Sequence, residues 1–554
     1  MAASSSPIPP AWDHCALDAD AENPVGCRGC KVDPHERCLA HISETDLAAY
    51  LGSLSPGSNL DHRGTTLTPA LLQRVLAALR DPSSERPRLG KAEFVEATFA
   101  VTADFRGVDF TDEAWFTHAK FTGTSEFTES VFTGDAWFGS ATFTGTSWFT
   151  NARFNRIARF GGATFSSVVF GGMTFCSDAR FIGTTFEVAS RIGPLVCRGN
   201  LNLTGAVFGA PVTIEAAAAN LTCQRARWAS TGSMHVRYAA VDFSDAVVEY
   251  PLRVTSRQSP FTIFNSYAAV DESELEGRDT GVQITSLRGM DTAHLTLSNV
   301  DLSKCQLTGT IHLDQLRLEG RCGFADTPRG LHRQAWRLVR WTPRRSIAEE
   351  QHWRHFHGAA GGWAPIRGLG EPIGPESLAP TYRQLRKSLE DSKNEPDAAD
   401  FYYGEMEMRR HDHERPRAER VLLALYWALS GYGLRASRAI AWLLVSMTVT
   451  VLALMLWGLP TALPEPKSTG ELTGQHIALI THTPEPVNPD GPVPKRLTTD
   501  RFERALRVGI NSVVFRTSGQ QLTTAGSYTE MCSRLAEPVL LGLAALAIRG
   551  RVKR

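Results

Sequence analysis

Residues 92–127 read AEFVEATFAVTADFRGVDFTDEAWFTHAKFTGTSEF, and a phenylalanine returns every five or six positions. Neither a helix, with a period of 3.6, nor a strand, with a period of 2, places every fifth residue on one side. A chain that turns a corner after each short face places every fifth residue on the inside. The stretch therefore predicts a solenoid with a phenylalanine core. The series is Phe94, Phe99, Phe105, Phe110, Phe116, Phe121, Phe127, Phe132, Phe138, Phe143, Phe149, Phe154, Phe160, Phe165, Phe170, Phe175, Phe181 and Phe186.

A small residue stands two positions before nearly every one of these phenylalanines, as Ala92, Ala114 and Ser125 do. This pattern resembles the unit of the pentapeptide-repeat family, which consists of a small residue, a polar residue, a central Phe or Leu and two more polar residues. The resemblance implies a right-handed quadrilateral β-helix in which the phenylalanines point inward. Successive coils of such a solenoid pair about 4.8 Å apart. We therefore expect a mainly β protein, with helices only outside this rod.

The spacing alternates five, six, five, six through Phe165, so one coil should take about 22 residues rather than 20. The extra residue falls in the corners ahead of the small positions, and three of these corners centre on Gly123, Gly134 and Gly145. We expect a positive φ at these glycines, as in a bulge. Between Phe165 and Phe175 the spacing falls to five and five, so the register should break there.

Corners that recur at this interval should stack their outward side chains into two columns on opposite sides of the rod. One column comprises Trp115, Trp137 and Arg159, and the other comprises Asp104, Glu126 and Trp148. These columns make the rod surface a candidate binding site for a protein partner whose identity the sequence does not give.

The N-terminal region holds four cysteines, Cys15, Cys27, Cys30 and Cys38, with His14, His35 and His41 beside them. Four thiolates can close a tetrahedral structural zinc site, so we predict these four cysteines as metal ligands. The alternative is a loop with spare thiols. No secretory signal is present at the start of the sequence, so we expect this region in the cytoplasm, where its thiols stay reduced.

The sequence divides into five parts. Residues 1–90 form a cysteine-rich segment and a helical cap, with Ser43 or Thr45 starting one helix and Thr68 and Pro69 starting another. Residues 91–190 form the phenylalanine-rich solenoid, and residues 191–325 continue it in degenerate coils, with Leu297, Leu302, Leu307, Leu313 and Leu318 in the core positions. Residues 326–430 form a helical linker, and residues 431–554 form a membrane domain.

Residues 331–363 are dense in Arg and Trp, and three interpretations stay open: stacking on single-stranded nucleic acid, contact with lipid headgroups, and a packed helical cap. Residues 439–459 then lack any charge over a length that crosses a hydrocarbon layer about 30 Å thick. Arginines precede this span, so its N-terminal side and the basic C-terminal tail should face the cytoplasm. The expected location is therefore the plasma membrane.

A proline-rich outer loop (461–501), an amphipathic half-helix (502–515) and a second span (about 530–548) follow. This order resembles the two-transmembrane pore module of potassium channels, although the usual filter run is absent. The resemblance makes Thr523, Thr524, Gly526 and Glu537 the pore candidates, and it implies a homo-oligomer formed through the membrane helices. A carboxyl such as Glu537 within a bilayer normally faces a bundle interior or a water path.

Composition gives no preference for charged partners, because 58 basic residues balance 58 acidic ones. No nucleotide-binding loop, nucleophile elbow or zinc-protease helix occurs, so we expect no enzyme. The best prediction is a membrane-anchored scaffold whose cytoplasmic solenoid binds a protein, coupled to a small pore. The alternative is a gyrase-directed or nucleic-acid-directed mimic of DNA, suggested by the acidic residues of the repeats. The exposed tryptophans and the membrane span disfavour that alternative.

Overall fold

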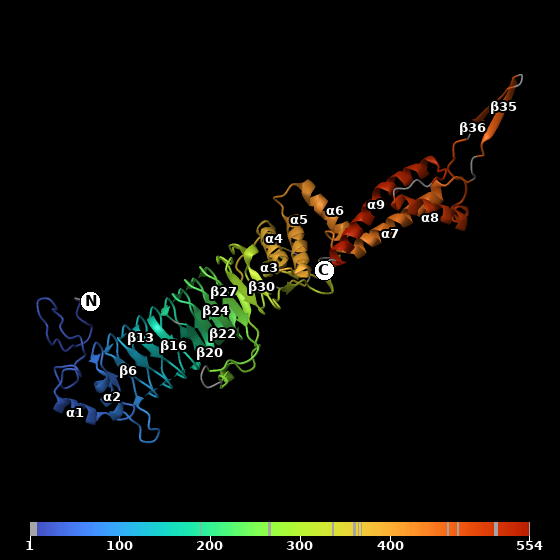
Figure 1. Ribbon diagram of the computed structural model, residues 1–554. Coiled ribbons are helices and arrows are strands. Elements are labelled where there is room, and N and C mark those ends of the chain that lie inside the picture. The colour runs from blue at the N-terminus through green and yellow to red at the C-terminus, as the bar shows by residue number, and fades with distance from the viewer. Residues whose placement is uncertain are drawn as a thin grey trace. The chain divides into compact units, whose positions relative to one another are not determined.

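The computed structural model describes residues 8–188, 190–263, 268–334, 337–357, 362–363, 365–366, 368–461, 465–473, 476–482, 484–514 and 519–552. The chain forms two compact units, Met1–Phe401 and Tyr402–Arg554. The first unit is a β-solenoid of about 10 turns with helices at its ends, and Figure 1 shows its strands stacked from blue to yellow. The second unit is mainly helical.

The first unit begins with two helices that both follow the predicted caps. Ser43 caps α1 (Glu44–Ser53), and Thr68 caps α2 (Pro69–Ala78) with Pro69 in its first turn. The short strands around them and along the regular solenoid are β1 (Leu60–Asp61), β2 (Thr66–Leu67), β3 (Arg88–Leu89), β4 (Ala92–Glu93), β5 (Thr98–Phe99), β6 (Thr102–Asp104), β7 (Asp109–Phe110), β8 (Ala114–Trp115), β9 (Lys120–Phe121), β10 (Thr124–Glu126), β11 (Val131–Phe132), β12 (Ala136–Trp137), β13 (Thr142–Trp148), β14 (Arg153–Phe154), β15 (Ala158–Arg159), β16 (Thr164–Val169), β17 (Met173–Phe175), β18 (Ala179–Arg180) and β19 (Thr185–Val188).

The register confirms a coil of 22 residues, since Phe99 pairs with Phe121 and Phe121 with Phe143. All the phenylalanines of the series that the exposure values cover are buried. Through most of the series each ring stacks on the ring one coil away; for Phe110 and Phe132 the centroids lie 4.5 Å apart at 4°. Rings of neighbouring faces can meet edge to face, as Phe110 and Phe116 do at 82°. Both geometries are favourable for aromatic pairs, so the core is continuous along the rod.

The predicted reason for the three corner glycines is wrong. Positive φ recurs at the other set of corners, two residues after alternate phenylalanines, at residues such as Glu96, Gly107 and Glu129, whereas in the glycine-containing set Val101 has it and the three glycines do not. Gly123, Gly134 and Gly145 instead lie against the backbone of the preceding coil. A Cβ on Gly123 would stand 1.7 Å from the carbonyl oxygen of Val101. Glycine is therefore required there by the close approach of two coils and not by φ.

The predicted register break is confirmed, because β13 and β16 shift relative to one another between Phe143 and Thr146. From Phe165 to Phe186 the pairing interval is 21 residues, one fewer than before. The later coils are irregular but continuous: β20 (Arg191–Asn202), β21 (Val207–Phe208), β22 (Val212–Thr222), β23 (Arg227–Trp228), β24 (Gly232–Arg237), β25 (Ala240–Asp242), β26 (Val247–Val248), β27 (Leu252–Ser256), β28 (Gln283–Ser286), β29 (Leu295–Ser298) and β30 (Arg317–Glu319), with short 3₁₀ turns η1 (Ser273–Leu275) and η2 (Leu313–Gln315).

The β structure continues beyond residue 325, where the sequence predicts the solenoid to end and a helical linker to begin. An antiparallel pair, β31 (Ala325–Asp326) with β34 (Arg345–Ser346), encloses the hairpin of β32 (Leu331–Gln334) and β33 (Arg337–Arg340). Helices α3 (Ala348–Phe356) and α4 (Pro375–Asp391) follow, and α5 (Glu395–His411) crosses into the second unit. Trp336, part of the predicted Arg/Trp cluster, lies outside the described residues.

These helices cover the C-terminal end of the solenoid. Glu349 of α3 is buried and accepts hydrogen bonds from the backbone N–H groups of Leu307 and Thr308, at 2.5 and 2.8 Å. Burial raises the pKa of its carboxyl. Behind it, Glu350 is buried between the guanidinium groups of Arg344 and Arg354, at 2.6 and 2.7 Å. The packed-cap interpretation of this arginine-rich segment is therefore confirmed for these buried residues.

The second unit comprises the end of α5, then α6 (Arg417–Ser430), α7 (Ala436–Ala453), the π-helical turn η3 (Leu454–Gly458), η4 (Val493–Arg496), α8 (Thr499–Val513) and α9 (Thr524–Val552). Gly431 ends α6 in the left-handed region, with φ of 55°. The proline-rich loop contains a hairpin, β35 (Lys467–Thr473) with β36 (His476–His482). The second apolar helix starts at Thr524 and is longer than predicted.

The corner glycines give the first prediction. Gly123→Ala should lower the free energy of unfolding by about 1–3 kcal/mol, because the new Cβ forces the coils apart. Gly139→Ala is the matched control, since a Cβ there meets only ordinary contacts at 3.8 Å. Thermal unfolding followed by circular dichroism measures both variants. Equal melting temperatures for the two would contradict the proposed close approach.

Candidate functional sites

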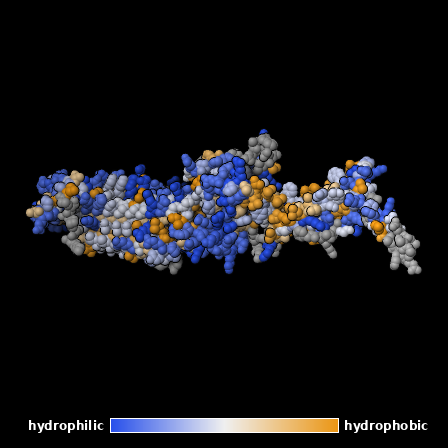
Figure 2. Space-filling view, turned by 90° about the horizontal axis from the view of Figure 1, so that it is seen from above, coloured by the Kyte–Doolittle hydropathy of each residue, from blue (hydrophilic) through white to orange (hydrophobic). Residues whose placement is uncertain are grey.

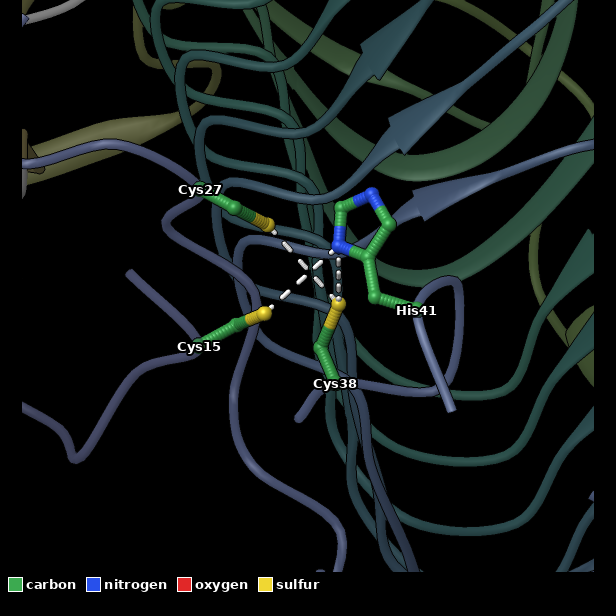
Figure 3. Close-up of side chains that lie close together, drawn as sticks. All are labelled: Cys15, Cys27, Cys38 and His41. Atoms are coloured by element: carbon green, nitrogen blue, oxygen red, sulfur yellow. Dashed lines mark hydrogen bonds between the residues drawn. The ribbon is translucent and has the colours of Figure 1, made fainter. Parts of the chain in front are cut away.

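The clearest cluster of chemically reactive side chains lies in the N-terminal segment. The side chains of Cys15, Cys27, Cys38 and His41 converge, and their candidate ligand atoms all lie within 4.8 Å of one another (Figure 3). The Sγ atoms of Cys27 and Cys38 are 3.7 Å apart, and the Nδ1 atom of His41 is 3.3 Å from Cys38 Sγ and 3.5 Å from Cys15 Sγ. Three thiols and an imidazole can hold a metal ion, and this donor set suits structural zinc.

Three of the four predicted ligands belong to this group, but His41 takes the place assigned to Cys30. The segment from Cys27 to Cys30 pairs with residues 14–17 as an antiparallel strand would, and residues three apart in such a segment point to opposite sides. A turn closes from Cys38 to His41, where the N–H of His41 donates to the carbonyl of Cys38 at 2.9 Å. A turn brings residues three apart to the same side. Local backbone conformation, which the spacing does not reveal, therefore selects the fourth ligand.

The thiols of this segment differ in acidity. The hydrogen bond from Cys38 lowers the pKa of Cys27 to about 5 and raises that of Cys38. Burial raises the pKa of Cys30 to about 11, so this thiol stays protonated at neutral pH. The backbone N–H of Cys30 donates to Arg63 in the first coil at 2.7 Å. Cys30 thus attaches the segment to the solenoid, whereas the other three cysteines face one another.

The solenoid surface carries both predicted columns. Trp137 pairs in register with Trp115 on one side and Arg159 on the other, and the two indole rings stack at 4.5 Å and 4°. The guanidinium of Arg159 lies 3.8 Å from the Trp137 ring centroid and pairs with Asp135 at 2.7 Å. This arrangement is a cation–π stack on a rigid frame. The second column is also in register, with Glu126 between Asp104 and the exposed Trp148.

The second unit contains two helices long and apolar enough to cross a membrane, Ala436–Gly458 and Thr524–Arg549. Polar side chains are buried where they meet. Thr450 of α7 donates to Glu537 of α9 at 2.9 Å, and Ser533 of α9 donates to Ser512 of α8, also at 2.9 Å. All four residues are buried, Glu537 completely. Three helices thus share a small polar core.

The four pore candidates do not form a filter loop. Thr524 and Gly526 lie in the first turn of α9, and Thr523 precedes it. The hydroxyl of Thr523 donates to the carbonyl of Trp457 at 2.7 Å, and a Cβ on Gly526 would meet the backbone of Gly458 at 2.3 Å. These residues pack the start of α9 onto the end of the first apolar helix. Thr517 and Ser518, part of the sequence compared with a filter, lie outside the described residues.

A buried arginine that sequence reasoning missed holds the same region together. The guanidinium of Arg501 in α8 donates to the carbonyls of Met455, Leu459 and Pro460 at 2.8 to 3.2 Å. Carbonyls at the end of a helix lack intrahelical donors, so this arginine caps the first apolar helix. The amphipathic pattern predicted α8, but not which carbonyls its arginine would reach.

The comparisons with known proteins agree with the solenoid. The family model for pentapeptide repeats matches residues 88–131 and 127–174. This part of the chain is a pentapeptide-repeat solenoid. The repeat segment thereby confirms the resemblance drawn from its phenylalanines. No curated protein and no solved structure matches the chain. Pentapeptide-repeat proteins are typically scaffolds that bind other proteins rather than enzymes.

The buried polar pair of the second unit gives a prediction. Thr450→Val removes the hydroxyl partner of the buried Glu537 carboxyl and should destabilise the unit by about 1–3 kcal/mol. Thr448→Val is the matched control on the same helix, because Thr448 is exposed and bonds only to the carbonyl of Leu444. The melting temperatures in detergent micelles compare the two. A smaller loss for Thr450→Val than for Thr448→Val would contradict the assigned pair.

Proposed function

We propose that the chain is a membrane-anchored scaffold whose solenoid presents a protein-binding surface in the cytoplasm. The observation that carries this proposal is the exposed apolar surface of α7 and α9. Only 28% of the most apolar stretch of the first helix and 33% of that of the second are buried, and Leu444, Val449, Val539 and Leu546 are exposed, whereas the core helix of a soluble protein would bury them. Broad apolar areas over the C-terminal helices are visible in Figure 2. Such a surface fits lipid.

The positions of charges support two antiparallel spans. Thr450 lies 12 residues after Arg438, and Glu537 lies 12 residues before Arg549. At 1.5 Å per residue, each polar partner is about 18 Å along its helix from an arginine. Their hydrogen bond then joins two helices whose arginines face the same side. By the positive-inside rule this side faces the cytoplasm. The N-terminal unit and the C-terminal tail then lie in the cytoplasm as well.

The column of Trp115, Trp137 and Arg159 supports the binding role, since aromatic residues and arginine are enriched at interfaces. Mimicry of DNA is disfavoured by the pairing of surface acids with arginines. Asp104 pairs with Arg106 at 2.7 Å and Asp109 with Arg86 at 2.9 Å, in addition to Asp135 with Arg159. A rod that copies the phosphate charge of DNA needs its carboxylates unneutralised.

A cysteine-accessibility experiment tests the proposal. In intact cells, Asp490→Cys in the outer loop should react with an impermeant maleimide, because that segment lies outside. Lys120→Cys, exposed on the solenoid, should react only after lysis. The protein with its native cysteines sets the background, and alkaline extraction checks that the chain stays with membranes. Labelling of Lys120→Cys in intact cells, or a soluble chain, would overturn the proposal.

A pore formed by several copies is the second candidate function, and the observation that favours it is the buried carboxyl of Glu537. Its Oε1 atom accepts from Thr450, and its Oε2 atom has no partner among the described residues. Ion flux through liposomes containing the protein, lost in Glu537→Gln, would support conduction. Absence of flux from the unmutated protein across pH and voltage would remove this candidate and leave the anchor unaffected.

A further inference from the structure

We propose that Cys15, Cys27, Cys38 and His41 bind one zinc ion, and that this ion clasps the N-terminal segment, residues 8–42, onto the first coil of the solenoid. The inference is independent of the membrane anchor. It assigns a metal to the cluster and a structural role to that metal, namely to hold residues 8–42 against the first coil.

The distances fit a tetrahedral ion. With Zn–S bonds of about 2.3 Å and Zn–N bonds of about 2.0 Å, the ligand atoms of a tetrahedron lie about 3.5–3.8 Å apart. Three of the six separations are close to these values, namely 3.7 Å between the sulfurs of Cys27 and Cys38 and 3.3 and 3.5 Å from the sulfurs of Cys38 and Cys15 to the His41 nitrogen, and the other three are at most 4.8 Å. The same distance excludes a Cys27–Cys38 disulfide in this conformation, because an S–S bond is about 2.05 Å long.

The segment has little regular secondary structure and only a small apolar core of its own. Between residues 8 and 42 the structure has only isolated bridges, His14 with Cys30 and Lys31 with Cys38, and no helix or longer strand. Few of its apolar side chains are buried, among them Val25, Val32 and Leu39. Segments this small and irregular usually need a metal or disulfides to be stable. A metal joining positions 15, 27 and 38–41 closes both of its loops.

Contacts of the clasped segment lead directly to the first coils. Arg28, next to the ligand Cys27, pairs with Glu96 at 2.8 Å, and its carbonyl accepts from the indole of Trp12 at 2.9 Å. Gly64 fits under this carbonyl, since a Cβ there would lie 2.3 Å from it. A Cβ on Gly29 would in turn meet the Cys38 side chain at 2.7 Å. The metal therefore fixes the loop that touches the coil.

Metal analysis of the full-length protein, purified in detergent without chelators, tests the site. We expect about one zinc per chain. His41→Ala should lose zinc, with affinity falling by more than about tenfold, whereas Cys30→Ser should keep it. His41→Cys, which restores four ligands, should also keep it and controls for misfolding of the alanine variant. A wild-type protein without zinc, loss in Cys30→Ser equal to that in His41→Ala, or no zinc in His41→Cys would overturn the ligand set.

Limited proteolysis tests the clasp. Trypsin sites at Arg28, Lys31 and Arg37 should be cleaved several-fold faster after a high-affinity chelator removes zinc, while sites within the solenoid keep their rates. Readdition of zinc should restore protection. If the chelator removes zinc and cleavage at these three sites does not change, the ion binds without holding the segment and the clasp is refuted.

Discussion

The ring-on-ring stacking of phenylalanines one coil apart is the constraint on which the first unit depends. Each five-residue face is too short to bury its own Phe, so burial comes only from the coils above and below. A coil of 22 residues keeps four columns of rings in line. In one of them Phe99 pairs with Phe121, and Phe121 pairs with Phe143. Where the register shifts, after Phe143, the column is disturbed, since Phe149 and Phe170 meet edge to face instead of stacking.

A stack of this kind has two ends that expose backbone and rings, and both are covered. At the C-terminal end Glu349 accepts two backbone N–H groups of the last coils, and an acid buried between two arginines supports the helix that carries it. Near the other end, four side chains that could hold a metal ion converge in the segment that precedes the first coil. One end is thus closed by buried charge, and the other lies near a candidate metal site.

The periodicity of the phenylalanines allowed the solenoid to be predicted from the sequence, because their spacing determines which residues face inward and which stack in columns. It did not reveal backbone contacts. Gly123 is required by a coil that passes close to it, and His41 replaces Cys30 because residues 27–30 pair as a strand would whereas residues 38–41 form a turn. Composition likewise identified the two apolar helices. Composition did not show that α9 starts at Thr524, so that Thr524 and Gly526 lie in a helix and not in a filter loop, or that Arg501 caps carbonyls of the first apolar helix. Both features depend on packing among segments far apart in the chain.

The 22-residue coil is the central claim, and internal deletion measures it most directly. Removal of residues 117–138 takes out one whole coil and joins Phe116 to Gly139, so every later ring keeps its column. Removal of residues 117–136 takes out only 20 residues and rotates all later coils out of register. The account predicts cooperative thermal unfolding by circular dichroism for the first deletion and loss of the transition for the second. Equally folded proteins from both deletions would contradict it.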